Sequence, residues 1–219
     1  MLTRVTLHGR LVRLEPMTID HIDDLCLAAA ENRSTYSYTN VPDGPDEMRR
    51  YVEGALTALS NGRALPFVVR RLETGRVVGT TRFLDLQVFS WPPPWPPGVA
   101  TGPSPSDATP PTVAEIGSTW YAASAQRTGV NTECKLLMLS HAFDSWHTIR
   151  VTLKTDARNV RSRAAIERLG AVFEGVRRAH VAASDGSVRN TAYYSILAEE
   201  WPAVRANLEE RLERGLKGV

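Results

Sequence analysis

The feature that most constrains this chain is a proline-rich stretch near its middle. Nine of the 14 prolines fall between Pro92 and Pro111, and the stretch opens with Trp91-Pro-Pro-Pro-Trp95-Pro-Pro-Gly98. Because proline fixes φ and lacks a backbone N–H, this stretch can be neither a helix nor a central strand. It is therefore either a linker between two domains or a long loop inserted into one.

The sequence on either side of this stretch favours an insertion. The hairpin expected before it and the strand expected after it show no separate hydrophobic core, so both belong in one sheet. A chain of 219 residues is long enough for one large domain. We therefore expect a single domain over residues 1–219, with a proline-rich insertion at residues 88–112.

The overall composition indicates an ordinary globular protein. Hydrophobic residues make up 42% and charged residues 23%, and the formal net charge is +2. This near-balance of charge argues against binding to duplex DNA. No apolar run approaches the ~18 residues that a membrane span needs, and no secretory signal is evident at the N-terminus. Cys26 and Cys134 lack metal-ligand spacing, so we expect a cytoplasmic, reduced protein with no metal, nucleic-acid or membrane partner.

Hydrophobic periodicity predicts alternating helices and strands. Apolar alternation indicates strands, helical spacing with Thr18 as a cap indicates the first helix, and Glu73-Thr74-Gly75 joins a hairpin. The fold class is therefore α+β. The expected strands are Val5–Glu15, Leu65–Leu72, Arg76–Leu86, Val113–Tyr121, Ile149–Thr155, Ala171–Arg178 and Asn190–Leu197, and the expected helices are 18–29, 46–60, Gly129–Ser145, Asn159–Leu169 and a tail from Glu199.

The stretch from Glu115 to Thr132 has the local chemistry of an anion site. A strand leads through a polar turn, Gln126-Arg127-Thr128-Gly129, into a helix whose first amides are free. Gly129 would let the backbone approach an anion closely, and Arg127 adds positive charge. The turn matches neither a Walker loop nor Gly-x-Gly-x-x-Gly, so an ordinary structural turn is the alternative.

The motifs that follow this turn favour an anion site over an ordinary structural turn. A further strand is followed by Asp156-Ala157-Arg158-Asn159 and then by a helix that ends in Leu169-Gly170-Ala171. This order resembles the GNAT superfamily of acyl-CoA N-acyltransferases, and most closely the branch of the ribosomal-protein N-terminal alanine acetyltransferases (RimJ/RimL-like). The likeness extends to Glu199-Glu200-Trp201 and covers nearly the whole chain, the proline insertion excepted.

The resemblance implies a fold and a reaction. The fold is a mixed central sheet splayed between its fourth and fifth strands, flanked by helices, with an extra C-terminal helix. The reaction is transfer of an acetyl or other short acyl group from acetyl-CoA, or another acyl-CoA, to a primary amine of a protein, peptide or small molecule. Attack would be direct, in a ternary complex, since no residue has the pairing of a covalent nucleophile. Members of the family are often homodimers.

The resemblance also assigns residues to the acyl donor. Backbone amides near Trp120 and Tyr121 would polarise the thioester carbonyl. Asn159 matches a pantetheine contact, and Arg163 is a candidate partner of the adenosine 3′-phosphate, with a solvated helix charge as the alternative. Asn131 departs from the family pattern, which has Gly or Ala there. The diphosphate loop comprises Gln126, Arg127, Thr128, Gly129, Val130, Asn131 and Thr132.

Two residues are candidates for proton transfer. An amine must lose a proton before it attacks, and Glu115 stands where many relatives carry the base, although a merely solvated glutamate is the alternative. The leaving thiolate is protonated in many relatives by a tyrosine, but Ile166 stands at that place. Ser162 would hydrogen-bond the sulfur instead, unless it only caps or packs its helix.

The acceptor side is less constrained by the sequence. Tyr36, Tyr38 and Arg82 lie where substrate contacts usually come from in such a fold, and core packing is the alternative for the aromatic residues. By hypothesis, Trp91 and Trp95 cover the acceptor site or a partner subunit. The competing functions are a non-catalytic acyl-CoA-binding module and, less favoured, a nucleic-acid binder using the arginines between residues 158 and 168.

Overall fold

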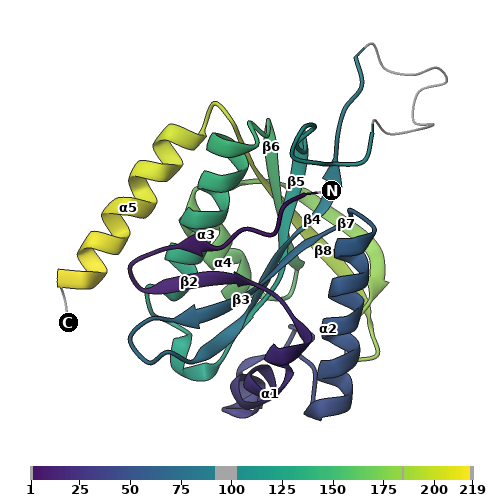
Figure 1. Ribbon diagram of the computed structural model, residues 1–219, viewed down its shortest axis with the longest axis vertical. Coiled ribbons are helices and arrows are strands. Elements are labelled where there is room, and N and C mark those ends of the chain that lie inside the picture. The colour runs from purple at the N-terminus through teal and green to yellow at the C-terminus, as the bar shows by residue number, and fades with distance from the viewer. Residues whose placement is uncertain (1, 92–102, 184, 218–219) are drawn as a thin grey trace.

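The computed structural model describes residues 2–91, 103–183 and 185–217. Within them, one mixed sheet of eight strands runs in the order β1-β2-β3-β4-β5-β6-β8-β7 (Figure 1). The strands are β1 (Leu7–His8), β2 (Val12–Pro16), β3 (Leu65–Arg71), β4 (Val77–Gln87), β5 (Val113–Tyr121), β6 (Arg150–Asp156), β7 (Val172–Ala182) and β8 (Val188–Leu197).

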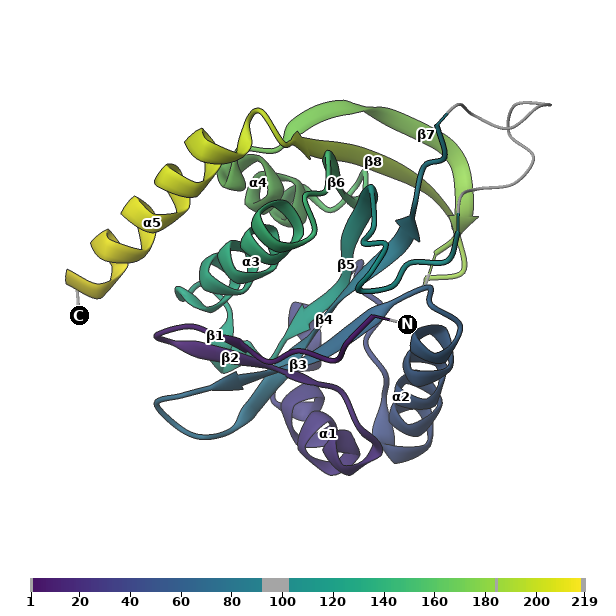
Figure 2. The same ribbon diagram turned by 45° about the horizontal axis from the view of Figure 1, so that its top comes forward.

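Helices cover both faces of this sheet. One face carries α1 and α2, and the opposite face carries α3, with α4 and α5 beside it (Figures 1 and 2). The helices α1, α2 and α3 each direct an apolar stripe at the sheet, as Leu25, Val52 and Met138 show by being fully buried, and α5 packs on α3 and α4. The helices are α1 (Ile22–Ala30), α2 (Gly44–Ser60), α3 (Val130–Ser140), α4 (Val160–Leu169) and α5 (Trp201–Lys217).

The strands β5 and β6 form the only parallel pair of the described sheet, and they separate soon after they meet. Pairing extends only from Val113 opposite Arg150 to Glu115 opposite Thr152, although both strands continue well beyond. The sheet is therefore splayed at this point, as predicted. The splay falls between the fifth and sixth labelled strands because the first predicted strand is in fact two.

That first strand, predicted as Val5–Glu15, is broken by a turn between β1 and β2. The peptide N–H groups of Arg10, Leu11 and Val12 donate to the carboxylate of Glu133 on α3, at 2.8, 2.7 and 2.8 Å. These bonds hold the turn against α3. An apolar alternation cannot reveal such a break, because the carboxylate comes from a distant part of the chain.

Smaller differences affect three further elements. The second helix begins at Gly44 rather than near Asp46, with Pro45 in its first turn, where a missing N–H costs nothing. The predicted helix to Ser145 is α-helical only to Ser140 and ends in a π-helical turn. The strand predicted to end at Arg178 continues to Ala182.

The proline-rich stretch connects two adjacent strands. The strands β4 and β5 pair from Gly79 opposite Tyr121 to Gln87 opposite Val113. Trp91 is largely exposed and packs edge-on against Phe89. Residues 92–102, including Trp95, lie outside the described residues. A connection between neighbouring strands supports the proposal of one domain with an insertion.

No helix among the described residues is long and apolar enough to cross a membrane.

Candidate active site

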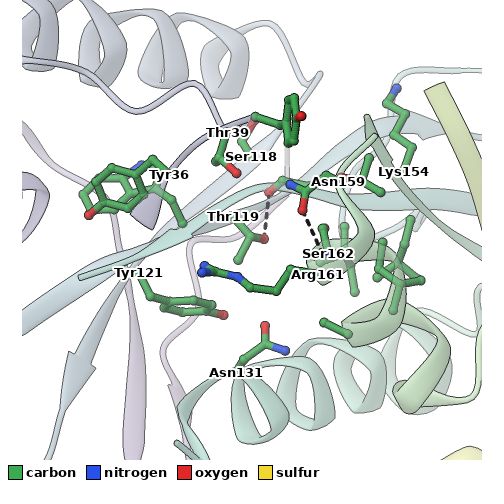
Figure 3. A pocket seen from close by; sticks show the side chains of 18 of the residues that line it. Tyr36, Thr39, Ser118, Thr119, Tyr121, Asn131, Lys154, Asn159, Arg161 and Ser162 are labelled. Carbon is green, nitrogen blue, oxygen red and sulfur yellow. Dashed lines mark hydrogen bonds between the residues drawn. The ribbon is translucent and has the colours of Figure 1, made fainter. Parts of the chain in front are cut away.

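A cavity of about 1200 Å³ opens where β5 and β6 separate. Its wall is formed by these two strands, the N-terminal half of α3, one face of α4 and the connection between α1 and α2, with further residues from α2 and β4. Figure 3 shows side chains from these elements converging on the space, among them Thr119, Tyr121, Asn131, Arg161 and Ser162. The splay therefore creates a space that a long ligand could enter.

The strand β5 is irregular where it lines this cavity. Its pairing with β4 shifts register between Thr80 and Arg82, and Ser118 has a positive φ of 46°. The Ser118 carbonyl accepts hydrogen bonds from the hydroxyls of Tyr51 at 3.3 Å and Thr80 at 3.2 Å. Such a β-bulge redirects backbone and side-chain groups, and bulges are frequent beside active sites.

Glu115 lies in the cavity wall at the root of the splay and is 3% exposed. Its carboxylate contacts the Lys154 ammonium at 2.6 Å, and the same ammonium contacts Asp85 at 3.2 Å. Burial raises the pKa of Glu115 to about 7, although Lys154 opposes this shift, and the nearby Asp85 charge reinforces it. Glu115 is therefore a buried carboxyl group that can gain or lose a proton near neutrality, and not a solvated one.

The turn before α3 is built differently from the sequence-based prediction. The left-handed residue is Arg127, with φ of 60°, whereas Gly129 has an ordinary helical φ of −68°. A Cβ on Gly129 would lie 2.7 Å from a methyl carbon of Leu11. The Leu11 side chain of the β1–β2 turn packs against this glycine and would have to shift to admit a larger residue. Gly129 and Val130 do not line the cavity, whereas Gln126, Arg127, Thr128, Asn131 and Thr132 do.

The N-terminus of α3 offers unpaired donors to the cavity. The Glu133 N–H donates to the carbonyl of Gly129, which is the N-cap residue of the helix. The Val130 N–H donates to the Thr128 hydroxyl. Within the described chain, the amides of Asn131 and Thr132 have no acceptor. Free amides and the helix dipole favour an anion at this point.

Cationic and amide side chains extend this anion-favouring region. The Arg161 guanidinium on α4 donates to the side-chain oxygen of Gln126 at 2.8 Å, and the Gln126 amide group donates to the Tyr121 carbonyl at 2.9 Å. Both Arg127 and Arg161 line the cavity. The turn, α4 and the end of β5 are therefore tied together around one positive wall.

The N-terminus of α4 contains Asn159 and Ser162. The Asn159 side chain is the N-cap and accepts from the Ser162 amide at 2.9 Å, so the cap is Asn159 and not Ser162. Both line the cavity. Arg163 does not line it; its guanidinium donates to the Tyr194 hydroxyl at 2.9 Å and lies 5.3 Å from the Phe173 ring centre.

The three residues predicted for the acceptor side are placed in different ways. Tyr36 and Tyr38 line the cavity; Tyr36 packs edge-on against Trp120, and the Arg158 guanidinium lies 4.8 Å from the Tyr38 ring centre. Arg82 is 8% exposed and does not line the cavity. Its guanidinium lies 4.6 Å from the ring centre of Tyr51, which does.

Several cavity residues were not predicted from the sequence. They are Asp85, Lys154, Lys135, Tyr51 and Arg161. For Lys135 the available signal was a charged residue beside the apolar residues of its helix, whereas Lys154 stands on the polar side of an alternating strand and gave no signal. Asp85 gave no such signal, because its position depends on the irregular pairing between Leu84 and Gln87.

Comparison with known proteins identifies the family. The model of the acetyltransferase (GNAT) domain matches residues 11–172. The chain therefore belongs to the GNAT acetyltransferases, and it is an acyltransferase. This membership favours an enzyme over the non-catalytic module considered above. The search of curated protein sequences found no match.

Solved structures agree with this assignment. A GCN5-related N-acetyltransferase from Brucella melitensis is 28% identical with a TM-score of 0.77, covering 96% of this chain and 86% of that one. A predicted acetyltransferase from T. thermophilus is 29% identical with a TM-score of 0.74, covering 97% and 99%. Mycobacterium smegmatis RimJ, solved with CoA-disulfide, is 20% identical with a TM-score of 0.70, covering 95% and 93%, and shows the shared fold.

Proposed function

We propose that this acyltransferase moves an acetyl or other short acyl group from acyl-CoA to a primary amine of a protein, peptide or small molecule. Attack by the amine on the thioester is direct, in a ternary complex. The observation that carries this proposal is the position of Glu115, a buried carboxyl group that titrates near neutrality in the wall of the cavity at the splay. A base with such a pKa suits the removal of a proton from an amine at neutral pH.

The donor would lie along the open edge of β5, with its diphosphate at the N-terminus of α3. The free amides of Asn131 and Thr132, together with Arg127 and Arg161, supply positive charge there. The arm of the donor would then reach the bulge at Ser118, and backbone amides of β5 would polarise the thioester carbonyl. RimJ, which shares the fold, was solved with a CoA derivative.

Direct transfer is also supported by the state of Cys134, the buried cysteine of α3. Burial raises the pKa of its thiol to about 12, so the thiolate needed for a covalent intermediate does not form near neutral pH.

A homodimer remains a prediction, to be tested by sedimentation equilibrium.

Acetyl-CoA is expected to bind with a micromolar or tighter Kd in titration calorimetry, and the affinity should fall as salt rises because the diphosphate wall is cationic. Arg161→Met should weaken binding about tenfold, since it removes a charged donor from the wall. Arg163→Met is the matched comparison, being the same change on the same helix outside the cavity wall. If only Arg163→Met lost affinity, Arg163 and not Arg161 would be the residue that contacts the donor. If no binding occurred at millimolar acetyl-CoA, the proposed donor would be refuted.

A further inference from the structure

Lys135 on α3 is a buried cation without a counter-ion. It is 5% exposed, and no carboxylate of the described chain forms a salt bridge with its ammonium or influences its pKa. Among the described residues, the ammonium donates only to two hydroxyls, those of Thr119 at 2.9 Å and Thr81 at 3.4 Å. Burying an ammonium group without an opposite charge costs free energy. Such a residue is therefore a candidate for a functional role.

The position of Lys135 connects it to the cavity. Asn131, Thr132 and Lys135 share the face of α3 that lines the cavity, at helical spacing. Its partner Thr119 is the next residue after Ser118, where β5 bulges beside the proposed path of the donor. The proposed reaction creates two negative charges beside β5. The oxyanion of the attacked carbonyl has the backbone amides of β5 as its proposed donors, whereas the thiolate of the departing CoA still needs a cation or a proton donor.

We propose that Lys135 is a catalytic residue that stabilises and protonates the CoA thiolate as it leaves. The inference rests on the proposed function. As the carbonyl C–S bond breaks, sulfur keeps the electron pair, and an S–H bond forms with a proton from the Lys135 ammonium. Lys135 regains a proton from solvent, and the attacking nitrogen gives up its extra proton to Glu115. The products are the amide and CoA thiol.

The chemistry of the surroundings suits this role. Burial lowers the pKa of Lys135 to about 8, close to that of an ordinary thiol, about 8.5, so proton transfer between them is nearly balanced. Two other titratable groups lie near it. Cys134 is its neighbour on α3, and Tyr121 of β5 lies beside Cys134; burial raises the pKa of both, so they are neutral near pH 8. The groups from β4 and from further along α3, Thr81 and Met138, do not titrate.

The test is a titration of CoA bound to the protein, followed by the ultraviolet absorbance of its thiolate. The complex with desulfo-CoA serves as reference, because it subtracts the tyrosines and cysteines of the protein. In the wild type, the pKa of the bound thiol should lie about one unit or more below that of free CoA. Lys135→Met should remove this shift and lower kcat about 100-fold, while leaving the Kd for desulfo-CoA unchanged.

Two further variants keep the outcome interpretable. Tyr121→Phe removes another buried donor of the cavity wall, a hydroxyl without a hydrogen-bond partner in the described chain, and should not move the thiol pKa. Lys135→Arg keeps the charge and should retain part of the shift, even if Lys135→Met folds poorly. An unshifted thiol in the wild type, or a shift lost in Tyr121→Phe but kept in Lys135→Met, would overturn the proposal. Failure to bind CoA at all would instead refute the proposed function.

Discussion

Replacing Glu115 with glutamine is expected to lower kcat for acetyl transfer by about 10²- to 10⁴-fold, while the Kd for acetyl-CoA changes little. Glutamine keeps the size and shape of the side chain but cannot accept a proton. The amine would then depend on the small fraction that is neutral in solution. Stopped-time assays against an amine panel, with the Kd measured by calorimetry, separate the two effects.

The pH dependence gives this prediction a second readout. Because burial raises the pKa of Glu115 to about 7, the base is protonated and inactive below that pH and ionised above it. The wild-type kcat/KM should therefore rise with pH and level off above about 7, and Glu115→Gln should lose this limb. A variant that keeps both the wild-type rate and the rising limb would remove Glu115 from the mechanism.

Asp85→Asn is the matched control for this assignment. The Asp85 charge raises the pKa of Glu115, so its removal should move the rising limb to lower pH without abolishing activity. The same substitution leaves Glu115 as the ion-pair partner of the Lys154 ammonium, and this cation also lowers the pKa of Glu115. A shift to higher pH would mean that the limb belongs to another group.

The order of elements could be read from the sequence because local signals coincide in the second half of the chain. Strand-favouring residues such as Val113, Ile116 and Tyr121 mark β5, Gly170 takes the left-handed conformation that ends α4, and both elements occur where the structure has them. Hydrophobic periodicity needs no knowledge of distant residues, so it locates elements well. It failed at the β1–β2 turn, where a carboxylate 121 to 123 residues away in sequence decides the conformation.

The candidate site was predicted unevenly for a related reason. Glu115 followed from the resemblance, but its partners Lys154 and Asp85 come from strands on either side, and only the pairing brings them together. The role of Gly129 at the diphosphate stays a prediction; the residue does not line the cavity, and it packs against Leu11 of the distant β1–β2 turn. The partners that a residue meets in distant segments cannot be identified from a single sequence.

The contact between the β1–β2 turn and α3 links stability to the donor site. Glu133 is 3% exposed, and its carboxylate accepts from three consecutive amides of the turn. Leu11, in that turn, packs against Gly129 at the N-cap of α3. The carboxylate therefore fixes the packing partner of the helix end that we propose as the diphosphate site.

Glu133→Gln is accordingly expected to destabilise the protein by about 3 kcal/mol, because the amide NH₂ replaces one acceptor and leaves buried N–H groups without a charged partner. Urea denaturation measures the change, and acetyl-CoA affinity should fall with it as the helix end loosens. Glu213→Gln is the control: it removes an ion pair with Arg10 of the same turn, but both side chains are about half exposed, so the change should stay within about 0.5 kcal/mol. If the two variants were equally stable, the turn would be held by its own hydrogen bonds and not by Glu133. If only stability fell and affinity did not, α3 would keep its position without the turn.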